Sequence, residues 1–132
     1  MKEEAETRQD LKDRTRDFAL RIVRLYSALP KATEAQVLGK QLLRSGTSAG
    51  AHWREGSRAR SNMEFVSKVE GGIQELEESL YWMELLVEAG IVKPDRIKEL
   101  TDEADELMAI LTSCVKKVKS RVKQKDEKPS NE

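Results

Sequence analysis

The chain has 132 residues, of which 36% are charged and 38% hydrophobic, with few aromatic, glycine or proline residues. This composition is typical of amphipathic helices around one core, and it disfavours a β sandwich or a large α/β enzyme scaffold. Lysine plus arginine and aspartate plus glutamate number 24 each, so the overall charge attracts neither nucleic acid nor a membrane, and only local patches would.

The first half of the chain predicts two helices. Residues 1–8 are expected to be frayed, and apolar side chains then recur at helical spacing over about residues 7–28, until Pro30 ends the pattern. The second helix is predicted over residues 33–56, with Thr33 as its cap. Its inward face is unusually small and polar, and it includes Gly46, Ser48, Gly50 and His52.

The second half predicts two more helices. Ser61 and Glu64 form a capping box, and the broad apolar stripe that follows ends at Gly90. Pro94 suits the first position of the fourth helix, whose apolar stripe continues to Val122.

The predicted elements define the fold class. Residues 124–132 have nothing to bury and are expected to be disordered. The loops between the helices are short, which forces neighbouring helices to be antiparallel. The sequence therefore predicts one domain, residues 9–123, folded as an all-α, antiparallel up-down-up-down four-helix bundle.

The composition excludes an internal disulfide and a classical His/Cys zinc site. One cysteine, Cys114, and one histidine, His52, allow neither an internal disulfide nor a His/Cys zinc site within one chain. We find no signal-peptide core and no apolar run long enough to cross a bilayer. We therefore expect a cytoplasmic protein with no cofactor and no membrane partner.

Residues 46–50 match the G-x-S-x-G pattern of a hydrolase nucleophile elbow. The match is formal, because the residues before it follow a helical period rather than that of a strand. An enzymatic hypothesis based on Ser48, His52 and Glu55 is therefore set aside, and no catalytic residue is predicted.

Small side chains at these positions instead indicate close helix packing. With a helical hairpin turning about residue 59, Gly46 and Gly50 would face Gly71 and Gly72. Interior glycines cost about 0.5 to 1 kcal/mol each relative to alanine, so a close approach or a functional contact has to offset them.

Charged side chains suggest one salt bridge and one shared patch. Glu75 and Glu78 flank the apolar stripe near Trp82, and Lys40 is the expected partner of Glu78 across the hairpin. Candidate nucleic-acid contacts are Arg54, Arg58 and Arg60 around the loop after the second helix, and Lys116, Lys117, Lys119, Arg121 and Lys123 near the end of the fourth. The predicted topology places both groups at one end of the bundle, although the second group would also complement the helix dipole.

Three segments carry a family resemblance. Residues 39–56 read GKQLLRSGTSAGAHWREG, residues 58–65 read RARSNMEF, and residues 75–86 read ELEESLYWMELL. This combination resembles the four-helix-bundle family named after the protein encoded in intervening sequences of bacterial 23S ribosomal RNA genes. Relatives include the accessory protein of diversity-generating retroelements, which assists a reverse transcriptase.

The resemblance implies a homo-oligomeric bundle, often a pentameric ring, with a proposed role in nucleic-acid binding and no enzymatic activity. It implies structural roles for the matching motif residues, which are Gln41, Arg44, Ser45, Ser48, Glu55, Glu64, Glu75, Glu78 and Trp82. Two features depart from the family: His52 stands where relatives usually have asparagine, and the balanced charge contrasts with the strongly basic retroelement proteins.

Two function hypotheses remain. The first is a non-enzymatic homo-oligomer, by resemblance a pentamer, whose basic end engages RNA, DNA or a nucleic-acid enzyme such as a reverse transcriptase. The second is a protein-binding or structural module of a mobile-element or other operon, with no nucleic acid bound.

Overall fold

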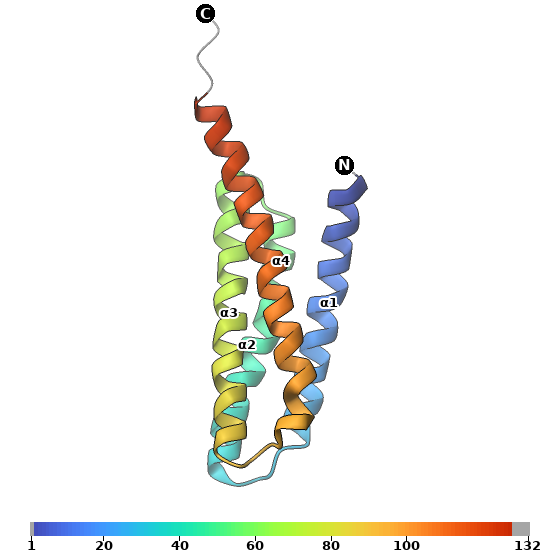
Figure 1. Cartoon of the computed structure of the whole chain (residues 1–132), viewed down its shortest axis with the longest axis vertical. Helices are drawn as coiled ribbons and strands as arrows, with labels where there is room; N and C mark the ends of the chain where they lie inside the picture. Colours follow the sequence, from blue (N-terminus) through green and yellow to red (C-terminus); the bar gives the residue numbers. More distant parts are fainter. Residues whose placement is uncertain (1, 128–132) are drawn as a thin grey trace, which may run out of the picture.

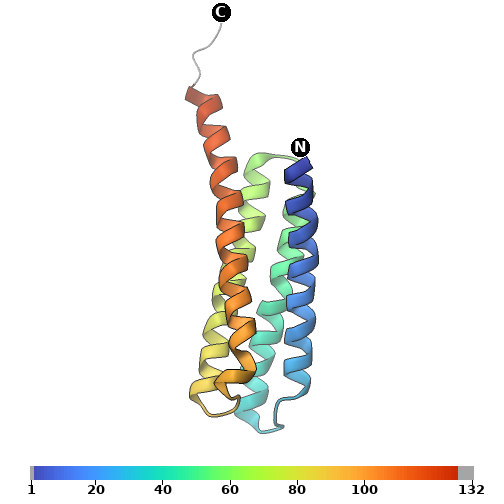
Figure 2. The same ribbon diagram turned by 45° about the vertical axis from the view of Figure 1, so that its right-hand side comes forward.

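The structure is a computed structural model that describes residues 2–127 of the chain. Four helices follow one another: α1 (Lys2–Ser27), α2 (Thr33–Ser57), α3 (Asn62–Glu88) and α4 (Pro94–Glu127). Figures 1 and 2 show them running alternately up and down, with α4 extending beyond the other three. The prediction of an all-α four-helix bundle is confirmed.

The core is formed by apolar stripes from all four helices. Each stripe follows the 3.6-residue period, so it lies on the side of its helix that faces the inside of the bundle. The side chains that are at most 2% exposed include Leu11, Phe18, Ile22, Leu42, Trp53, Val69, Leu76, Met83, Leu86, Leu107 and Leu111.

The helix ends follow local chemistry in most places. The Ser61 hydroxyl accepts from the Glu64 amide at 3.1 Å, and the Glu64 carboxylate accepts from the Arg60 amide at 3.2 Å. Gly90 ends the α3 segment with a φ of +74°, a left-handed conformation that glycine adopts without a steric cost. The predicted cap at Thr33 is wrong, because Ala32 occupies the N-cap position and no side chain caps α2.

The two chain ends differ from the predictions. Helix α1 begins at Lys2, inside the segment expected to fray, because its first turns contact other helices: Glu4 pairs with Arg121, and the Trp53 indole donates to the Arg8 carbonyl at 3.3 Å. Helix α4 continues to Glu127, into the segment expected to be disordered, while residues 128–132 lie outside the described residues.

The glycine prediction is wrong in its pairing. A Cβ atom on Gly46 would lie 2.9 Å from Ile22 Cγ1, and one on Gly50 would lie 3.2 Å from Thr15 Oγ1, so both glycines face α1 rather than α3. Gly72 instead approaches the Ala49 carbonyl, where a Cβ would lie at 3.4 Å. Close approach therefore occurs at both glycine clusters, but with different neighbours.

The two glycines lie on the side of α2 that faces α1, and the register of the α2–α3 hairpin also differs from the prediction. Ser45 on α2 lies opposite Ser79 on α3, with their hydroxyl oxygens 2.8 Å apart. Position 46 is consequently level with a part of α3 well beyond Gly72. Loop length alone does not determine how far one helix slides along its neighbour, and the sequence prediction assumed a symmetric turn.

Helices α1 and α4 share the least packing of the neighbouring pairs. Ion pairs hold these two helices together instead. Arg14 donates to both carboxylate oxygens of Glu103, at 2.7 and 3.1 Å, and contacts Glu106 at 3.1 Å. The partly buried pair with Glu103 raises the pKa of the Arg14 guanidinium.

Candidate nucleic-acid interface

The end of the bundle where α1 begins, the α2–α3 loop turns and α4 emerges is the candidate interface (Figures 1 and 2). We call it the basic end, after the eight exposed cations that the sequence predicted there: Arg54, Arg58, Arg60, Lys116, Lys117, Lys119, Arg121 and Lys123. The alternation of helix directions brings the two groups to this end, because α2 finishes and α4 finishes on the same side.

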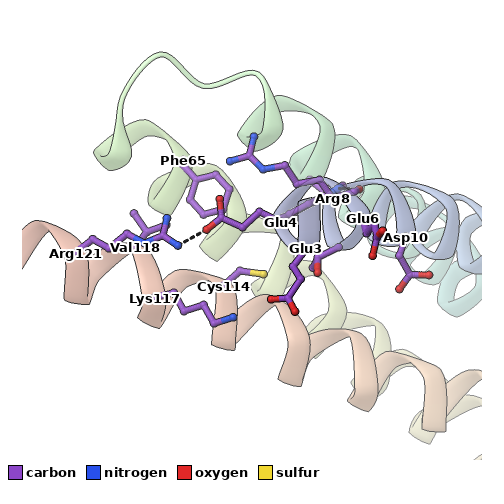
Figure 3. Close-up of a pocket in the computed structure, with 12 residues that line it drawn as sticks. Glu3, Glu4, Glu6, Arg8, Asp10, Phe65, Cys114, Lys117, Val118 and Arg121 are labelled. Carbon is purple, nitrogen blue, oxygen red and sulfur yellow. Dashed lines mark hydrogen bonds and ion pairs between the residues drawn. The ribbon is translucent and has the colours of Figure 1, made fainter. Parts of the chain in front are cut away.

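Lys119 and Arg121 are among the cations that contact acidic side chains. Lys119 Nζ lies 3.1 Å from a carboxylate oxygen of Glu70 on α3. Arg121 on α4 pairs with Glu4 on α1 (Figure 3). The hydrogen bond and charge of Arg121 lower the pKa of the Glu4 carboxyl, so that carboxylate stays ionised at neutral pH.

Arg8 belongs to this site, although the sequence did not single it out. Its guanidinium lies 5.7 Å from the centre of the Phe65 ring, a cation–π contact, and donates to the Ser57 carbonyl at 3.4 Å. Arg8 lines a recess of about 310 Å³ together with Arg60 and Arg121. It was missed because residues 1–8 were assigned to a frayed segment, where no side chain is given a fixed position.

The same end also carries negative charge. The start of α1 brings four carboxylates to a groove between α1 and α4, where Lys117 and Arg121 stand on the opposite side (Figure 3). These four carboxylates belong to Glu3, Glu4, Glu6 and Asp10. The basic end is therefore divided, with an acidic side on α1 and a basic side on α4.

The groove has a volume of about 610 Å³ and an apolar floor. Trp53, Phe65 and Val118 line it, and the thiol of Cys114 is directed into it (Figure 3). Partial burial raises the pKa of Cys114, so the thiol is protonated at neutral pH and is a poor nucleophile.

The family-motif residues lie mainly where α2 meets α3. The Arg44 guanidinium bridges Glu75 at 2.9 Å and Glu78 at 2.7 Å, and the Trp82 indole donates to Glu78 at 3.1 Å. The hydrogen bond from Arg44 lowers the pKa of the Glu78 carboxyl most, and the hydrogen bond from Trp82 lowers it further. The predicted partner of Glu78 was Lys40, which is wrong because the observed register places Arg44 opposite both carboxylates.

The remaining motif residues have local contacts. The Glu55 carboxylate lies 2.9 Å from Lys68 Nζ on α3, whereas Gln41 is exposed on α2. Ser45 is fully buried against Ser79, and Glu64 serves the cap of α3.

The residues once considered for catalysis do not form a catalytic arrangement. The Ser48 hydroxyl donates to the Arg44 carbonyl of its own helix at 2.7 Å, and Glu55 pairs with Lys68. The Nδ1 atom of His52 is buried beside Gly71 without a hydrogen-bond partner. Nucleophilic catalysis needs a hydrogen bond from nucleophile to base, and these side chains make none.

Neither a metal cluster nor a membrane span is found in the described part of the chain. Within it, His, Cys, Asp and Glu side chains do not gather in any group of three that would hold a metal ion. No helix among residues 2–127 is both long enough and apolar enough to cross a bilayer.

The protein is a small four-helix bundle. Polar contacts join α2 to α3, and cations gather at one end of the bundle. The chain belongs to the 23S rRNA-intervening sequence protein family, whose sequence model matches residues 7–113. The matched residues contain these polar contacts and the arginines of the α2–α3 loop, whereas the acidic start of α1 and the basic run of α4 lie outside them.

One solved structure gives a direct comparison. It is the crystal structure of a protein with unknown function from the S23 ribosomal protein family of Bacteroides thetaiotaomicron. The two chains are 34% identical and superpose with a TM-score of 0.79, over 83% of this chain and 98% of the other. No curated protein matches the chain at a significant level.

Proposed function

We propose that this protein is a non-enzymatic helical-bundle module that assembles with copies of itself and binds nucleic acid through its basic end. The observation that carries the proposal is the convergence of eight exposed lysines and arginines, from the α2–α3 region and α4, at one end of the fold. Lysine and arginine contacts with phosphates supply most of the sequence-independent affinity for nucleic acid.

Family membership supports the same proposal. The family is described as the 23S rRNA-intervening sequence protein family, a name connected with ribosomal RNA genes. Self-assembly into a pentamer, suggested by the sequence resemblance, would repeat the basic end around a ring and multiply its phosphate contacts. Light scattering of the purified protein measures this assembly directly.

The test of nucleic-acid binding is a salt titration. Fluorescence anisotropy with a structured RNA and with single-stranded DNA should give an affinity that falls steeply between about 50 and 200 mM salt. Replacing both Arg58 and Lys116 with glutamine should weaken binding and reduce the salt slope, because each lost phosphate contact lowers it by roughly one. Lys31→Gln plus Lys93→Gln, which removes two exposed cations at the opposite end, is the matched control.

Two outcomes would contradict nucleic-acid binding through the basic end. If the assembled protein binds neither RNA nor DNA at low salt, the basic end has another role. Equal losses of affinity for this double variant and for the double control at Lys31 and Lys93 would also contradict the assignment of the binding surface to this end.

A protein-binding module is the second candidate function, and one observation favours it. The groove between α1 and α4 has an apolar floor and carboxylates beside its cations, a combination that suits a protein segment better than a phosphate backbone. Recovery of one specific protein partner from nuclease-treated extract, combined with no binding in the anisotropy experiment, would establish this alternative.

A further inference from the structure

Three arginines from separate parts of the fold line one small recess beside the groove. Arg8 comes from α1, Arg60 from the α2–α3 loop and Arg121 from the end of α4, and the recess they share measures about 310 Å³. Like charges repel, so an anion placed among the three arginines would stabilise their convergence.

The geometry of this recess, which we call the arginine pocket, leaves donors available. Arg8 is held by Phe65 at 5.7 Å and by the Ser57 carbonyl at 3.4 Å, which fixes its position without neutralising its charge. The Arg60 side chain makes no ion pair within the described residues. Ser57 also lines the pocket, but its hydroxyl oxygen is buried, so the donors available to a ligand are the guanidinium groups, which bind phosphate oxygens.

We propose that the arginine pocket binds a terminal phosphate of a nucleic-acid strand, through Arg8, Arg60 and Arg121. This inference rests on the proposed function and assigns its most specific contact. A phosphate monoester carries about 1.5 to 2 negative charges at neutral pH, more than an internal phosphodiester, and the three arginines outnumber the two carboxylates beside them, Glu4 at Arg121 and Glu64 at the Arg60 amide. A recess receives the end of a strand, whereas an internal phosphodiester needs a track that is open on two sides.

Glu4 has a definite part in this site. Its carboxylate occupies Arg121, so it stands where a phosphate oxygen would bind and competes with it (Figure 3). Removing the charge at Glu4 should therefore strengthen phosphate binding, while removing the charge at Arg60 or Arg121 weakens it. Opposite effects from two substitutions at one ion pair are not expected if the pair only holds α1 against α4.

The experiment compares three versions of one short single-stranded RNA, with a 5′-phosphate, with a 3′-phosphate and with hydroxyls at both ends. The full chain should bind at least one phosphorylated version about tenfold more tightly than the hydroxyl version, which is the effect of one charge-assisted contact. Arg60→Gln and Arg121→Gln should reduce this ratio towards one, and Glu4→Gln should raise it. Arg58→Gln is the matched control, since Arg58 is equally exposed in the same loop region but does not line the pocket.

The control should lower affinity for all three RNAs while leaving their ratio unchanged. Circular dichroism melts of each variant check that the fold is intact. Arg60→Gln removes no ion pair of the described structure. It therefore still tests the pocket if Arg121→Gln unfolds α1.

The outcomes separate the two proposals. If all three RNAs bind equally well, the pocket assignment is overturned while nucleic-acid binding stands. If none binds, both proposals fail. Inorganic phosphate at matched ionic strength should abolish only the extra affinity of the phosphorylated RNA; if it stabilises the protein against heat while the RNA ends make no difference, the pocket takes free phosphate and the strand-end assignment is wrong.

Discussion

At the scale of single residues, the buried hydroxyl pair of Ser45 and Ser79 shows how a polar contact is accommodated between α2 and α3. Both side chains are fully buried, and each hydroxyl has one proton to donate. Ser79 donates to the Glu75 carbonyl at 2.8 Å, whereas the Leu42 carbonyl is 3.3 Å from the Ser45 oxygen. The better geometry has Ser45 donating to Ser79 and Ser79 donating to its own helix.

This proton order predicts unequal costs for the two alanine substitutions. Ser45→Ala leaves Ser79 with its 2.8 Å bond, but Ser79→Ala leaves Ser45 only the longer contact with Leu42. We expect Ser79→Ala to lower the free energy of unfolding by about 1 to 2 kcal/mol and Ser45→Ala by clearly less. Urea denaturation of both variants measures the difference; a larger loss for Ser45→Ala would show that the protons run the other way.

Gly46 is a second residue whose role depends on a single neighbour. A methyl group there would lie 2.9 Å from Cγ1 and 3.1 Å from Cγ2 of Ile22, a fully buried side chain. A β-branched side chain in a helix has one strongly preferred rotamer, so Ile22 cannot swing aside. Overpacking of about 1 to 3 kcal/mol should exceed the helix-propensity gain of about 1 kcal/mol.

We therefore expect Gly46→Ala to destabilise the wild-type protein but to be neutral or stabilising in an Ile22→Ala background. A double-mutant cycle measured by thermal or urea unfolding gives this coupling energy. Ala51→Gly, at an exposed position of the same helix, calibrates the propensity term. Equal effects of Gly46→Ala in both backgrounds would refute the close approach of α1 to α2 at this glycine.

At the scale of helices, the sequence predicted the elements better than their contacts. Apolar periodicity located all four helices, because a core-facing stripe is a local property of each segment. The start of α1 was missed since its charged residues have no such stripe, and they are held by Arg121 and Trp53, far away in the sequence. The stagger of α2 against α3 also depends on contacts between distant parts of the sequence. The sequence therefore predicted Lys40 rather than Arg44 as the partner of Glu78.

The α2–α3 seam makes a prediction about pH. Because Arg44 and Trp82 lower the folded-state pKa of Glu78 from its usual 4.5, the stabilisation from this carboxylate is complete above that value and is lost as the pH falls through the lowered pKa. The seam is partly exposed, so its contribution is expected to be about 0.5 to 1 kcal/mol.

The stability difference between the wild type and Arg44→Gln should therefore be constant near neutral pH and shrink as the pH falls below 4.5. Urea unfolding across this range measures it. Arg54→Gln, at an exposed arginine of the same helix, should show no such pH dependence. A difference that persists unchanged in acid would mean that Arg44 acts through packing of its side-chain stem rather than through Glu78.

For the molecule as a whole, the position of the basic end followed from topology, but its divided charge did not. The alternation of helix directions was enough to bring the α2–α3 loop and the end of α4 together. The same alternation brings the start of α1 there, and contacts with Arg121 and Trp53, which are far away in the sequence, hold it in place. Glu4 consequently pairs with Arg121, and Glu3 and Glu6 line the same groove.

Removing this acidic segment should therefore strengthen the attraction of the whole molecule for polyanions. Deleting residues 2–6 removes three glutamates and one lysine, a net gain of two positive charges at the basic end. We expect elution from a heparin column at higher salt, since the loss of nearby carboxylates raises the local positive potential. The variant Glu34→Gln plus Glu88→Gln is the matched control, because it changes the net charge equally with exposed residues at the opposite end. If both proteins elute together, net charge rather than its placement governs retention, and the acidic segment has no special effect on the basic end.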